Sequence, residues 1–180
     1  GPQMVSGNPD KLASSIEMIV LDVDGVLTDG LTYLNSEGIE AKAFNIRDGF
    51  SIFMAKHAGL KFGLITGLMS PIVEIRASKL GIEEVHQGFV DKDIVLTDII
   101  KRNDLRPDQV AYMGDDLFDI PAMRMAGFAA APADAEHEVK EVADWISSRT
   151  GGHGAVREFI ELILRSKGLW NEAVKFYTKA

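Results

Sequence analysis

Residues 18–25, MIVLDVDG, place two carboxylates directly behind an apolar run. A short apolar run that is rich in β-branched residues and ends at a glycine predicts a buried strand. Positions i and i+2 of an extended segment point the same way, so Asp22 and Asp24 would face one pocket. Two like charges this close repel each other and raise one pKa unless a cation neutralises them. We therefore expect a cation at the end of this strand.

The pattern of an apolar strand followed by a helix repeats along the chain. Further strands are predicted over residues 61–65, 85–86, 110–113 and 128–131, and helices over 50–57, 71–81, 91–102, 120–126, 156–164 and 170–177. This alternation predicts an α/β fold, with a Rossmann-like parallel sheet and helices on both faces. Ligands of such sheets bind outside the carboxyl ends of the strands.

One segment breaks the alternation. Residues 31–34 and 39–44 flank the sequence NSEG, which has turn chemistry, so they predict a β-hairpin. Ile39, Ala41 and Ala43 share one face of its second strand. A two-stranded ribbon cannot bury such an apolar stripe alone, so we expect the hairpin to pack against another surface.

Length and composition limit the classes of protein. The 180 residues suffice for one domain, assigned to residues 11–180, while residues 1–10 are expected to be disordered or tag-derived. A net charge of −8 argues against a nucleic-acid partner. No apolar run reaches the roughly 18 residues of a membrane span, so no membrane partner is expected. The lack of cysteine excludes a thiolate metal site and is compatible with the cytoplasmic location that we expect.

Polar residues end four of the predicted strands or open the helices behind them. Besides the first acidic pair, they are Thr66-Gly67, Lys92 and Asp115-Asp116. Oxygen ligands suit Mg²⁺, and Asp115 could complete its protein ligands. One carboxylate could then attack phosphorus while its neighbour transfers protons. The hydroxyl of Thr66 and the ammonium of Lys92 would balance the charge of a phosphoryl group.

These residues lie in segments that resemble a known family. DVDGVLTDG, LITG, QGFVDK and YMGDDLFDIPAM resemble, in order, the four motifs of the haloacid dehalogenase superfamily of phosphohydrolases. FNIRDG, IVEIRASKLGI and GGHGAVREF are similar to segments of its 3-deoxy-D-manno-octulosonate 8-phosphate phosphatase branch. The resemblance covers nearly the whole chain.

The resemblance implies a role for each motif residue. Asp22 would be the nucleophile that forms an aspartyl-phosphate, and Asp24 would be the general acid–base. Thr66 and Lys92 would hold the phosphoryl group. Mg²⁺ would bind Asp22, the backbone carbonyl of Asp24, and Asp115. Asp116 would be an orienting acid behind these ligands. Asp119 is interpreted as a cap of the short helix 120–126.

The resemblance also implies a small anionic sugar phosphate as substrate. The positions expected to bind it are Asn45, Arg47, Asp48, Gly49, Gly67 and Arg76. Leu68 departs from the branch, which usually carries a basic residue there, whereas a related nine-carbon sugar-acid phosphatase carries glutamate. A leucine cannot pair with a carboxylate. The octulosonate phosphate and the nine-carbon acid phosphate therefore both stay open as substrates.

Two other classes of protein are alternatives to a phosphatase. A phospho-receiver switch also uses Asp, Thr and Lys with Mg²⁺, but its acidic pair and its phosphorylated Asp lie on different strands. A non-catalytic protein on a degenerate fold is the other alternative. All residues that the chemistry requires are present, and only Leu68 departs from the pattern.

Assembly is the last expectation. Superfamily members often cover their sites with an inserted cap domain, but the gaps at residues 30–64 and 92–114 are too short for one. The resemblance to the phosphatase branch implies a homotetramer in which the hairpins of the subunits meet at the centre. We therefore expect a homotetramer with hairpin-mediated contacts, in which the tail at residues 170–180 helps to cover the site of a neighbour.

Overall fold

The computed structural model describes residues 1–4 and 8–180, and its centre is a seven-stranded sheet. The strand order is β1-β9-β8-β7-β2-β5-β6. Their bounds are β1 Gln3–Met4, β2 Met18–Leu21, β5 Lys61–Thr66, β6 Glu84–Gln87, β7 Val110–Met113, β8 Phe128–Ala131 and β9 Trp145–Ile146. Strand β1 runs antiparallel to β9, and the other pairs are parallel. The predicted Rossmann-like parallel sheet is confirmed.

Strand β2 lies inside the sheet, between β5 and β7. Leu21 lies opposite Leu64 on one side and Met113 on the other. All four residues of β2 are buried, as expected for a strand covered on both faces. The residue after Leu21 therefore emerges at the centre of the carboxyl edge.

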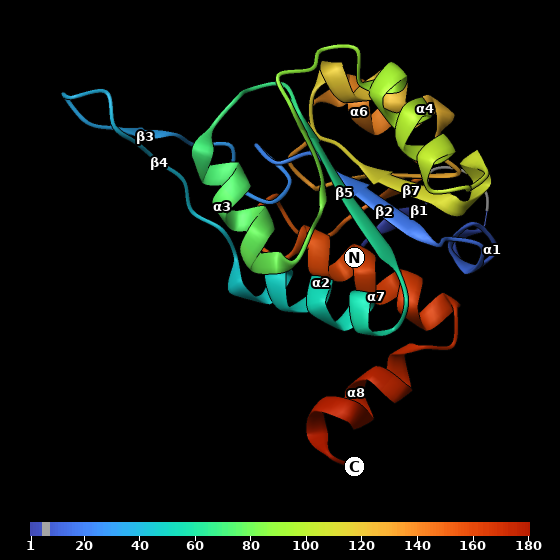
Figure 1. The fold of residues 1–180 in the computed structure, drawn as a ribbon. Helices are drawn as coiled ribbons and strands as arrows, with labels where there is room; N and C mark the ends of the chain where they lie inside the picture. The colour runs from blue at the N-terminus through green and yellow to red at the C-terminus, as the bar shows by residue number, and fades with distance from the viewer. Residues whose placement is uncertain (5–7) are drawn as a thin grey trace.

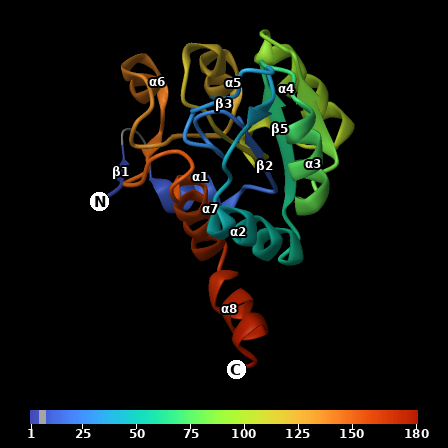
Figure 2. The same cartoon turned by 90° about the vertical axis from the view of Figure 1, so that its left-hand side faces the viewer.

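Helices cover both faces of the sheet, as Figures 1 and 2 show. One face packs against α1 Pro9–Ser14, α2 Ile46–His57, α3 Pro71–Leu80 and α7 Ala155–Ser166, and the other against α4 Lys92–Arg102, α5 Ile120–Met125 and α6 His137–Val142. The 3₁₀ turns are η1 Pro107–Gln109 and η2 Leu117–Asp119. Helix α8, Trp170–Thr178, projects from the end of α7, away from the sheet (Figure 1). No helix among the described residues has both the length and the apolar character needed to cross a membrane.

The apolar stripe predicted over 156–164 forms the buried face of α7. Val156, Phe159, Ile160, Ile163 and Leu164 are all fully buried. The Phe159 ring stacks on Trp145 and contacts Phe128, with centroid distances of 5.5 and 5.3 Å. Burying a large apolar side chain contributes about 1.5–3 kcal/mol, so this stripe anchors α7 to the sheet.

The hairpin is present but shorter than predicted. Its strands are β3 Tyr33–Leu34 and β4 Glu40–Ala41, and its turn is held by Asn35 Oδ1, which accepts from the N–H groups of Glu37 and Ile39. It projects from the body of the subunit (Figure 1). The apolar side chains of Leu31, Tyr33, Leu34 and Ile39 are each more than half exposed. The expected apolar surface is therefore left uncovered within one subunit.

The structure differs from expectation at the N-terminus and near residue 140. Within residues 1–10, Gln3–Met4 forms β1 and Pro9 begins α1, whose N-cap is Asn8. Residues 5–7 lie outside the described part of the chain. Helix α6 and strand β9 were not predicted, because each has too few residues to give a periodic pattern of apolar side chains. Short elements such as these depend on packing rather than on local sequence, which is why the sequence pattern did not predict them. The domain boundary at residue 10 stays a prediction.

Candidate active site

A cavity of about 440 Å³ lies at the carboxyl edge of the sheet. It is lined by Asp22, Asp24, Gly30, Thr66, Gly67, Leu68, Val90, Lys92, Asp115, Asp116 and Phe118. These residues come from the ends of β2, β5 and β7, from the segment that follows β6, and from the start of α4. The structure thus brings together all the residues predicted for catalysis and metal binding.

Lys92 joins two of the buried carboxylates. Its Nζ lies 3.3 Å from Asp22 Oδ2 and 2.8 Å from Asp119 Oδ1, and the residue is 2% exposed. Burial lowers the pKa of the Lys92 ammonium, but Asp22 and Asp119 outweigh it, so the pKa lies above its ordinary value. Burial and then Asp119 raise the pKa of Asp22 well above its usual range, against the charge of Lys92. Lys92 therefore stays charged beside the predicted nucleophile.

Asp119 is the buried acceptor that fixes this edge of the site. Its Oδ1 accepts from the Tyr112 hydroxyl at 2.5 Å and from Lys92 Nζ. Its Oδ2 accepts from the backbone N–H groups of Asp115 at 2.9 Å and Asp116 at 3.2 Å. Asp119 occupies the predicted N-cap position of α5, but its side chain makes no hydrogen bond to the start of that helix and instead closes the capping box of η2. It holds Lys92 and the Asp115 backbone in place.

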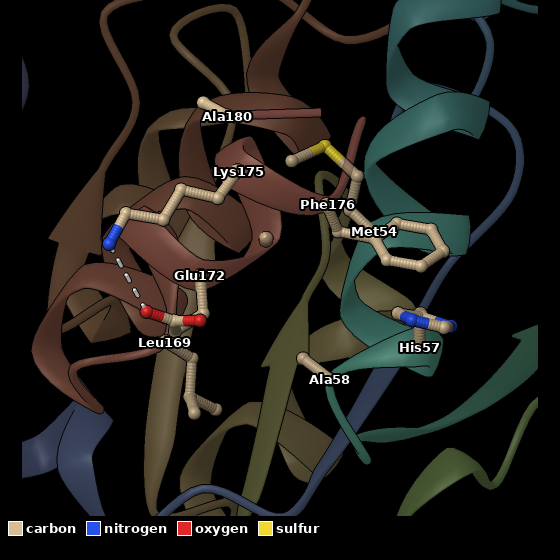
Figure 3. Close-up of a pocket in the computed structure, with 9 residues that line it drawn as sticks. Met54, His57, Ala58, Leu169, Glu172, Lys175, Phe176 and Ala180 are labelled. Atoms are coloured by element: carbon tan, nitrogen blue, oxygen red, sulfur yellow. Dashed lines mark ion pairs between the residues drawn. The ribbon is translucent and has the colours of Figure 1, made fainter. Parts of the chain in front are cut away.

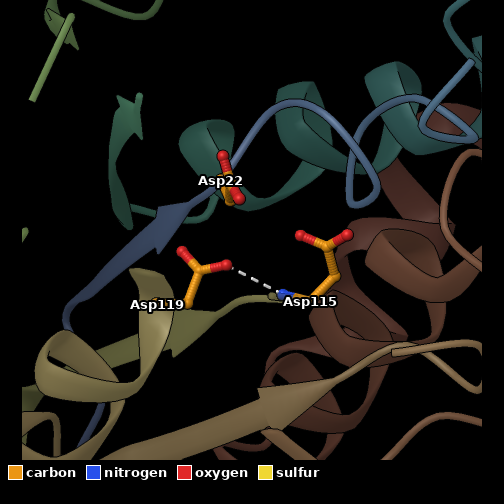
Figure 4. Close-up of side chains that lie close together, drawn as sticks. All are labelled: Asp22, Asp115 and Asp119. Carbon is orange, nitrogen blue, oxygen red and sulfur yellow. Dashed lines mark hydrogen bonds between the residues drawn. The ribbon is translucent and has the colours of Figure 1, made fainter. Parts of the chain in front are cut away.

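Asp115 has the properties of a cation ligand. One oxygen each of Asp22, Asp115 and Asp119 lie within 4.8 Å of one another (Figure 4). Burial, followed by the charge of Asp119, raises the pKa of Asp115 to about 7. In the described part of the chain, Asp115 Oδ1 is buried without a hydrogen-bond partner. Such an oxygen is costly unless a proton or a cation satisfies it. Since Asp119 is occupied, Asp22 and Asp115 are the side chains available to a hard divalent ion.

Gly25 makes room for Asp115. Its φ is +84°, a conformation that favours glycine, and a Cβ there would lie 1.8 Å from Asp115 Oδ2. The buried Thr28 accepts the Gly25 N–H with its Oγ1 at 3.2 Å and closes the loop after β2. The glycine of the DVDG segment is therefore required by the close approach of a carboxylate.

Asp24 is held by a lysine that the sequence pattern did not single out. Lys42, directly after β4, places its Nζ 2.6 Å from Asp24 Oδ1 and 3.1 Å from Glu40 Oε1. Burial lowers the pKa of Lys42, but its hydrogen bonds to Asp24 and Glu40 outweigh that effect, and the pKa is raised. The hairpin thus contributes a charged contact to the predicted general acid–base.

Other predicted residues complete the rim of the cavity. Thr66 is buried at the end of β5, and its carbonyl accepts from the N–H of Gly88 at 2.9 Å. Asp116 is exposed, and its Oδ1 accepts from the N–H of Leu117 at 2.7 Å. Leu68 is 65% exposed at the mouth. The cavity therefore combines charged residues with apolar ones, of which Leu68 and Phe118 are exposed.

Four residues predicted to bind substrate have structural contacts outside the catalytic cavity. Asn45 caps α2, and Asp48 Oδ1 accepts from the N–H of Arg157 in the first turn of α7 at 3.0 Å. A Cβ at Gly49 would lie 2.5 Å from an Arg76 nitrogen, so glycine permits this close contact. Two segments that resemble the phosphatase branch, about a hundred residues apart, therefore touch each other.

Arg47 lines a second cavity of about 340 Å³, together with Asn45, Arg149, His153, Gly154, Arg157, Glu158 and Glu161. Of the residues expected to bind substrate, only Gly67 lines the catalytic cavity. The structure shows no contact of Arg47 or Arg76 with that cavity in the described residues of one subunit. Their role toward a sugar acid stays a prediction.

A further hollow of about 450 Å³ lies between α2 and α8 (Figure 3). Met54, Leu169 and Phe176 give it apolar walls, and its rim carries a 3.6 Å ion pair between Lys175 and Glu172. It holds no cluster of acids that could bind a metal among the described residues. The chemistry is therefore concentrated in the cavity at the sheet edge.

Comparisons with known proteins agree with this geometry. A family model of the haloacid dehalogenase-like hydrolases matches residues 61–160, so the chain belongs to the haloacid dehalogenase-like hydrolase family. Among curated proteins, it is similar to the 3-deoxy-D-manno-octulosonate 8-phosphate phosphatase KdsC of Escherichia coli (strain K12). The two are 41% identical over 169 residues, which cover 94% of this chain and 90% of the relative.

Solved structures extend the likeness to the whole fold. The 3-deoxy-D-manno-octulosonate 8-phosphate phosphatase from Moraxella catarrhalis, in complex with a magnesium ion, a phosphate ion and KDO, gives a TM-score of 0.92 at 38% identity. The match covers 94% of this chain and 97% of that one. The phosphatase of the same name from Yersinia pestis gives a TM-score of 0.88 at 38% identity, over 90% and 88% of the two chains. The resemblance to this branch is confirmed.

Proposed function

We propose that this protein is a Mg²⁺-dependent phosphatase that hydrolyses the phosphomonoester of a 2-keto-3-deoxy sugar acid. The first candidate substrate is 3-deoxy-D-manno-octulosonate 8-phosphate, on which its relatives are named to act. The observation that carries the proposal is the buried Asp22 carboxylate, which pairs with Lys92 and lies close to Asp115, whose Oδ1 has no hydrogen-bond partner among the described residues. A cytoplasmic location stays a prediction.

The side chains of the cavity can divide the reaction into two steps. The Asp22 carboxylate attacks phosphorus, the bond from phosphorus to the sugar oxygen breaks, and Asp24 gives that oxygen a proton. Asp24 then takes a proton from the water that attacks the aspartyl-phosphate, which frees Asp22 and phosphate. Thr66 and Lys92 hold the phosphoryl oxygens throughout. Lys92 is fixed in place beforehand by Asp119, so little reorganisation is needed.

Mg²⁺ fits the donor set of this cavity. Asp22 and Asp115 offer carboxylate oxygens, and the backbone carbonyl of Asp24 is the third protein ligand that the resemblance implies. When bound, the ion would neutralise charge on the phosphoryl group and between the acids. The magnesium and phosphate ions in the Moraxella catarrhalis relative support this assignment.

Mg²⁺ should stabilise the protein more at high pH than at low pH. The pKa of about 7 at Asp115 lies above the unfolded value, so the metal-free fold retains a proton there until the pH passes 7. Stability from this group is present at low pH and lost as pH rises through that value, and Mg²⁺ competes with the same proton. At a hundredfold excess over Kd, Mg²⁺ should add about 2.7 kcal/mol, or roughly 5–10 °C in Tm.

The measurement is thermal unfolding with and without Mg²⁺ on either side of neutral pH. The rise in Tm should be larger on the alkaline side, and Asp115→Asn should remove most of it. An equal rise at both pH values, or a full rise in Asp115→Asn, would contradict the assignment of Asp115 as a ligand.

Phosphate release from a panel of sugar and sugar-acid phosphates, assayed with Mg²⁺, tests the proposed function. We expect turnover of the eight-carbon acid phosphate, and the nine-carbon acid phosphate is the alternative. A stable phosphoprotein after treatment with an acyl phosphate, without turnover, would favour a phospho-receiver instead. No phosphate release from any compound would support a non-catalytic protein.

Leu68 should reduce the preference of the enzyme for sugar-acid phosphates over hexose phosphates. It lies at the mouth of the cavity, where a basic residue could pair with a substrate carboxylate. Leu68→Arg is therefore expected to raise kcat/KM for sugar-acid phosphates over hexose phosphates by about 10-fold or more, since a charged hydrogen bond contributes about 1.5–3 kcal/mol. Met69→Arg, at an exposed neighbour outside the cavity lining, is the control. An unchanged preference in Leu68→Arg would exclude position 68 as a selectivity element.

We further propose a homotetramer with hairpin-mediated contacts. The apolar hairpin is uncovered, and the described residues form no cap domain over the catalytic cavity, although phosphoryl transfer benefits from excluding water. Within its own subunit α8 packs on α2, where the rings of Phe176 and His57 lie 4.1 Å apart. Because α8 packs on α2 of its own subunit and not on its own catalytic cavity, we propose that the tail helps to cover the cavity of a neighbouring subunit.

Light scattering and truncation test this assembly. We expect a tetramer, with reduced turnover when residues 171–180 are removed. A fully active monomer would refute the assembly, whereas an active tetramer without those residues would remove only the role of the tail.

A further inference from the structure

Lys42 has an enclosed position for a lysine that belongs to a projecting hairpin. Its side chain is 1% exposed, and its ammonium group contacts Asp24 at 2.6 Å and Glu40 at 3.1 Å. Lysine is rarely buried unless it is paired, so the surrounding acids hold it in place. The contact joins the segment after β4 to the loop after β2.

Asp24 needs such an anchor because its surroundings are acidic. It shares the catalytic cavity with Asp22 and Asp115, and neither acid can form an ion pair with its carboxylate. Its side chain is 25% exposed, so solvent offers an alternative position away from the substrate. The fixed side-chain partner of Asp24 in the described structure is Lys42. This contact restricts the directions in which the Asp24 carboxylate can point.

The contact leaves one oxygen of Asp24 available for chemistry. Lys42 binds Oδ1, so Oδ2 can face a leaving group or a water molecule. A general acid–base must come within about 2.6–3.2 Å of the proton that it transfers. A displacement of about 1 Å can cost roughly 100-fold in rate.

We propose that Lys42 is a positioning residue, which holds the Asp24 carboxylate by one oxygen so that the other can exchange protons with the leaving group and with water. The inference rests on the proposed function, in which Asp24 is the general acid–base. Lys42 acts through Asp24 and does not touch the substrate. Because Lys42 directly follows β4, it also ties the catalytic loop to the hairpin.

Lys42→Met tests the inference with the full chain. We expect kcat to fall by about 10- to 100-fold, while KM and the rise of Tm with Mg²⁺ remain unchanged. Lys42→Arg, which retains a positive donor, should recover most of the rate. Lys61→Met, at an exposed lysine at the start of β5, is the matched control and should behave as the wild type. If Lys42→Met fails to fold, Lys42→Gln replaces it.

A double-mutant cycle separates positioning from a general structural role. In the Asp24→Asn background, Lys42→Met should cause no further loss of kcat. An equal loss in both backgrounds, a loss confined to KM, or wild-type kcat in Lys42→Met would each overturn the inference while the proposed function stands. A wild-type protein without phosphatase activity on the whole panel would overturn the proposed function and this inference with it.

Discussion

Replacement of Asp22 by asparagine should abolish phosphate release. An amide is neither a nucleophile nor a good ligand for a hard cation, so both the covalent step and the metal site are lost. No other carboxylate is placed to substitute, because Asp115 follows β7 and Asp119 is already bound to Lys92 and Tyr112. Removing the covalent nucleophile of a serine protease costs on the order of 10⁶-fold in kcat, and we expect a loss of similar size here. Steady-state phosphate release with Mg²⁺ measures it.

The expected loss can be separated from unfolding. Asparagine has nearly the same shape as aspartate and keeps an oxygen that can accept from Lys92 Nζ, so the Tm of the metal-free protein should change little. Asp98→Asn, at an exposed acid of α4, is the control and should retain full activity. Full activity in Asp22→Asn, or in wild-type protein with excess EDTA, would exclude the proposed mechanism.

The central part of the site could be predicted because it follows from strand ends. Asp22 and Thr66 terminate apolar runs, and Asp115 follows the next one after a glycine. A parallel sheet places such residues at one edge whatever the details of packing, and the structure places them around one cavity. Lys92 could also be predicted to lie at this edge of the sheet, because it begins the helix that follows β6.

The supporting residues could not be predicted, because their roles arise only in three dimensions. Tyr112 is a strand residue with an apolar environment in the sequence, yet its hydroxyl binds Asp119. Asp119 has a sequence position typical of a helix cap, and its burial gives it a different role. Asp48 supplies a cap to α7, whose own N-cap is Gly154 and has no side chain. No local pattern encodes these long-range contacts.

Asp24→Asn should give the second largest loss and a different kinetic behaviour. The nucleophile and the carboxylate ligands of the metal remain, so the aspartyl-phosphate can still form from a substrate with a good leaving group. Its hydrolysis would lose the base that activates water, and general acid–base catalysis is typically worth 10²–10⁴-fold in rate. We therefore expect a fall of about this size in kcat for the sugar-acid phosphate. A burst of leaving group should appear with an activated aryl phosphate, which needs no protonation.

Rapid-mixing kinetics on the two substrates distinguish this behaviour from a general defect. The metal site should remain, because the backbone carbonyl of Asp24 is unchanged by the substitution, so the rise of Tm with Mg²⁺ is the internal control. The asparagine keeps the shape of the side chain, but its neutral amide oxygen accepts a hydrogen bond from the Lys42 ammonium in place of the 2.6 Å ion pair. Asp24→Glu, which restores the charge one methylene farther out, should recover little rate if position is decisive. A proportionate loss of burst and steady-state rates would show that Asp24 acts before the covalent step, and wild-type hydrolysis in Asp24→Asn would remove it from the mechanism.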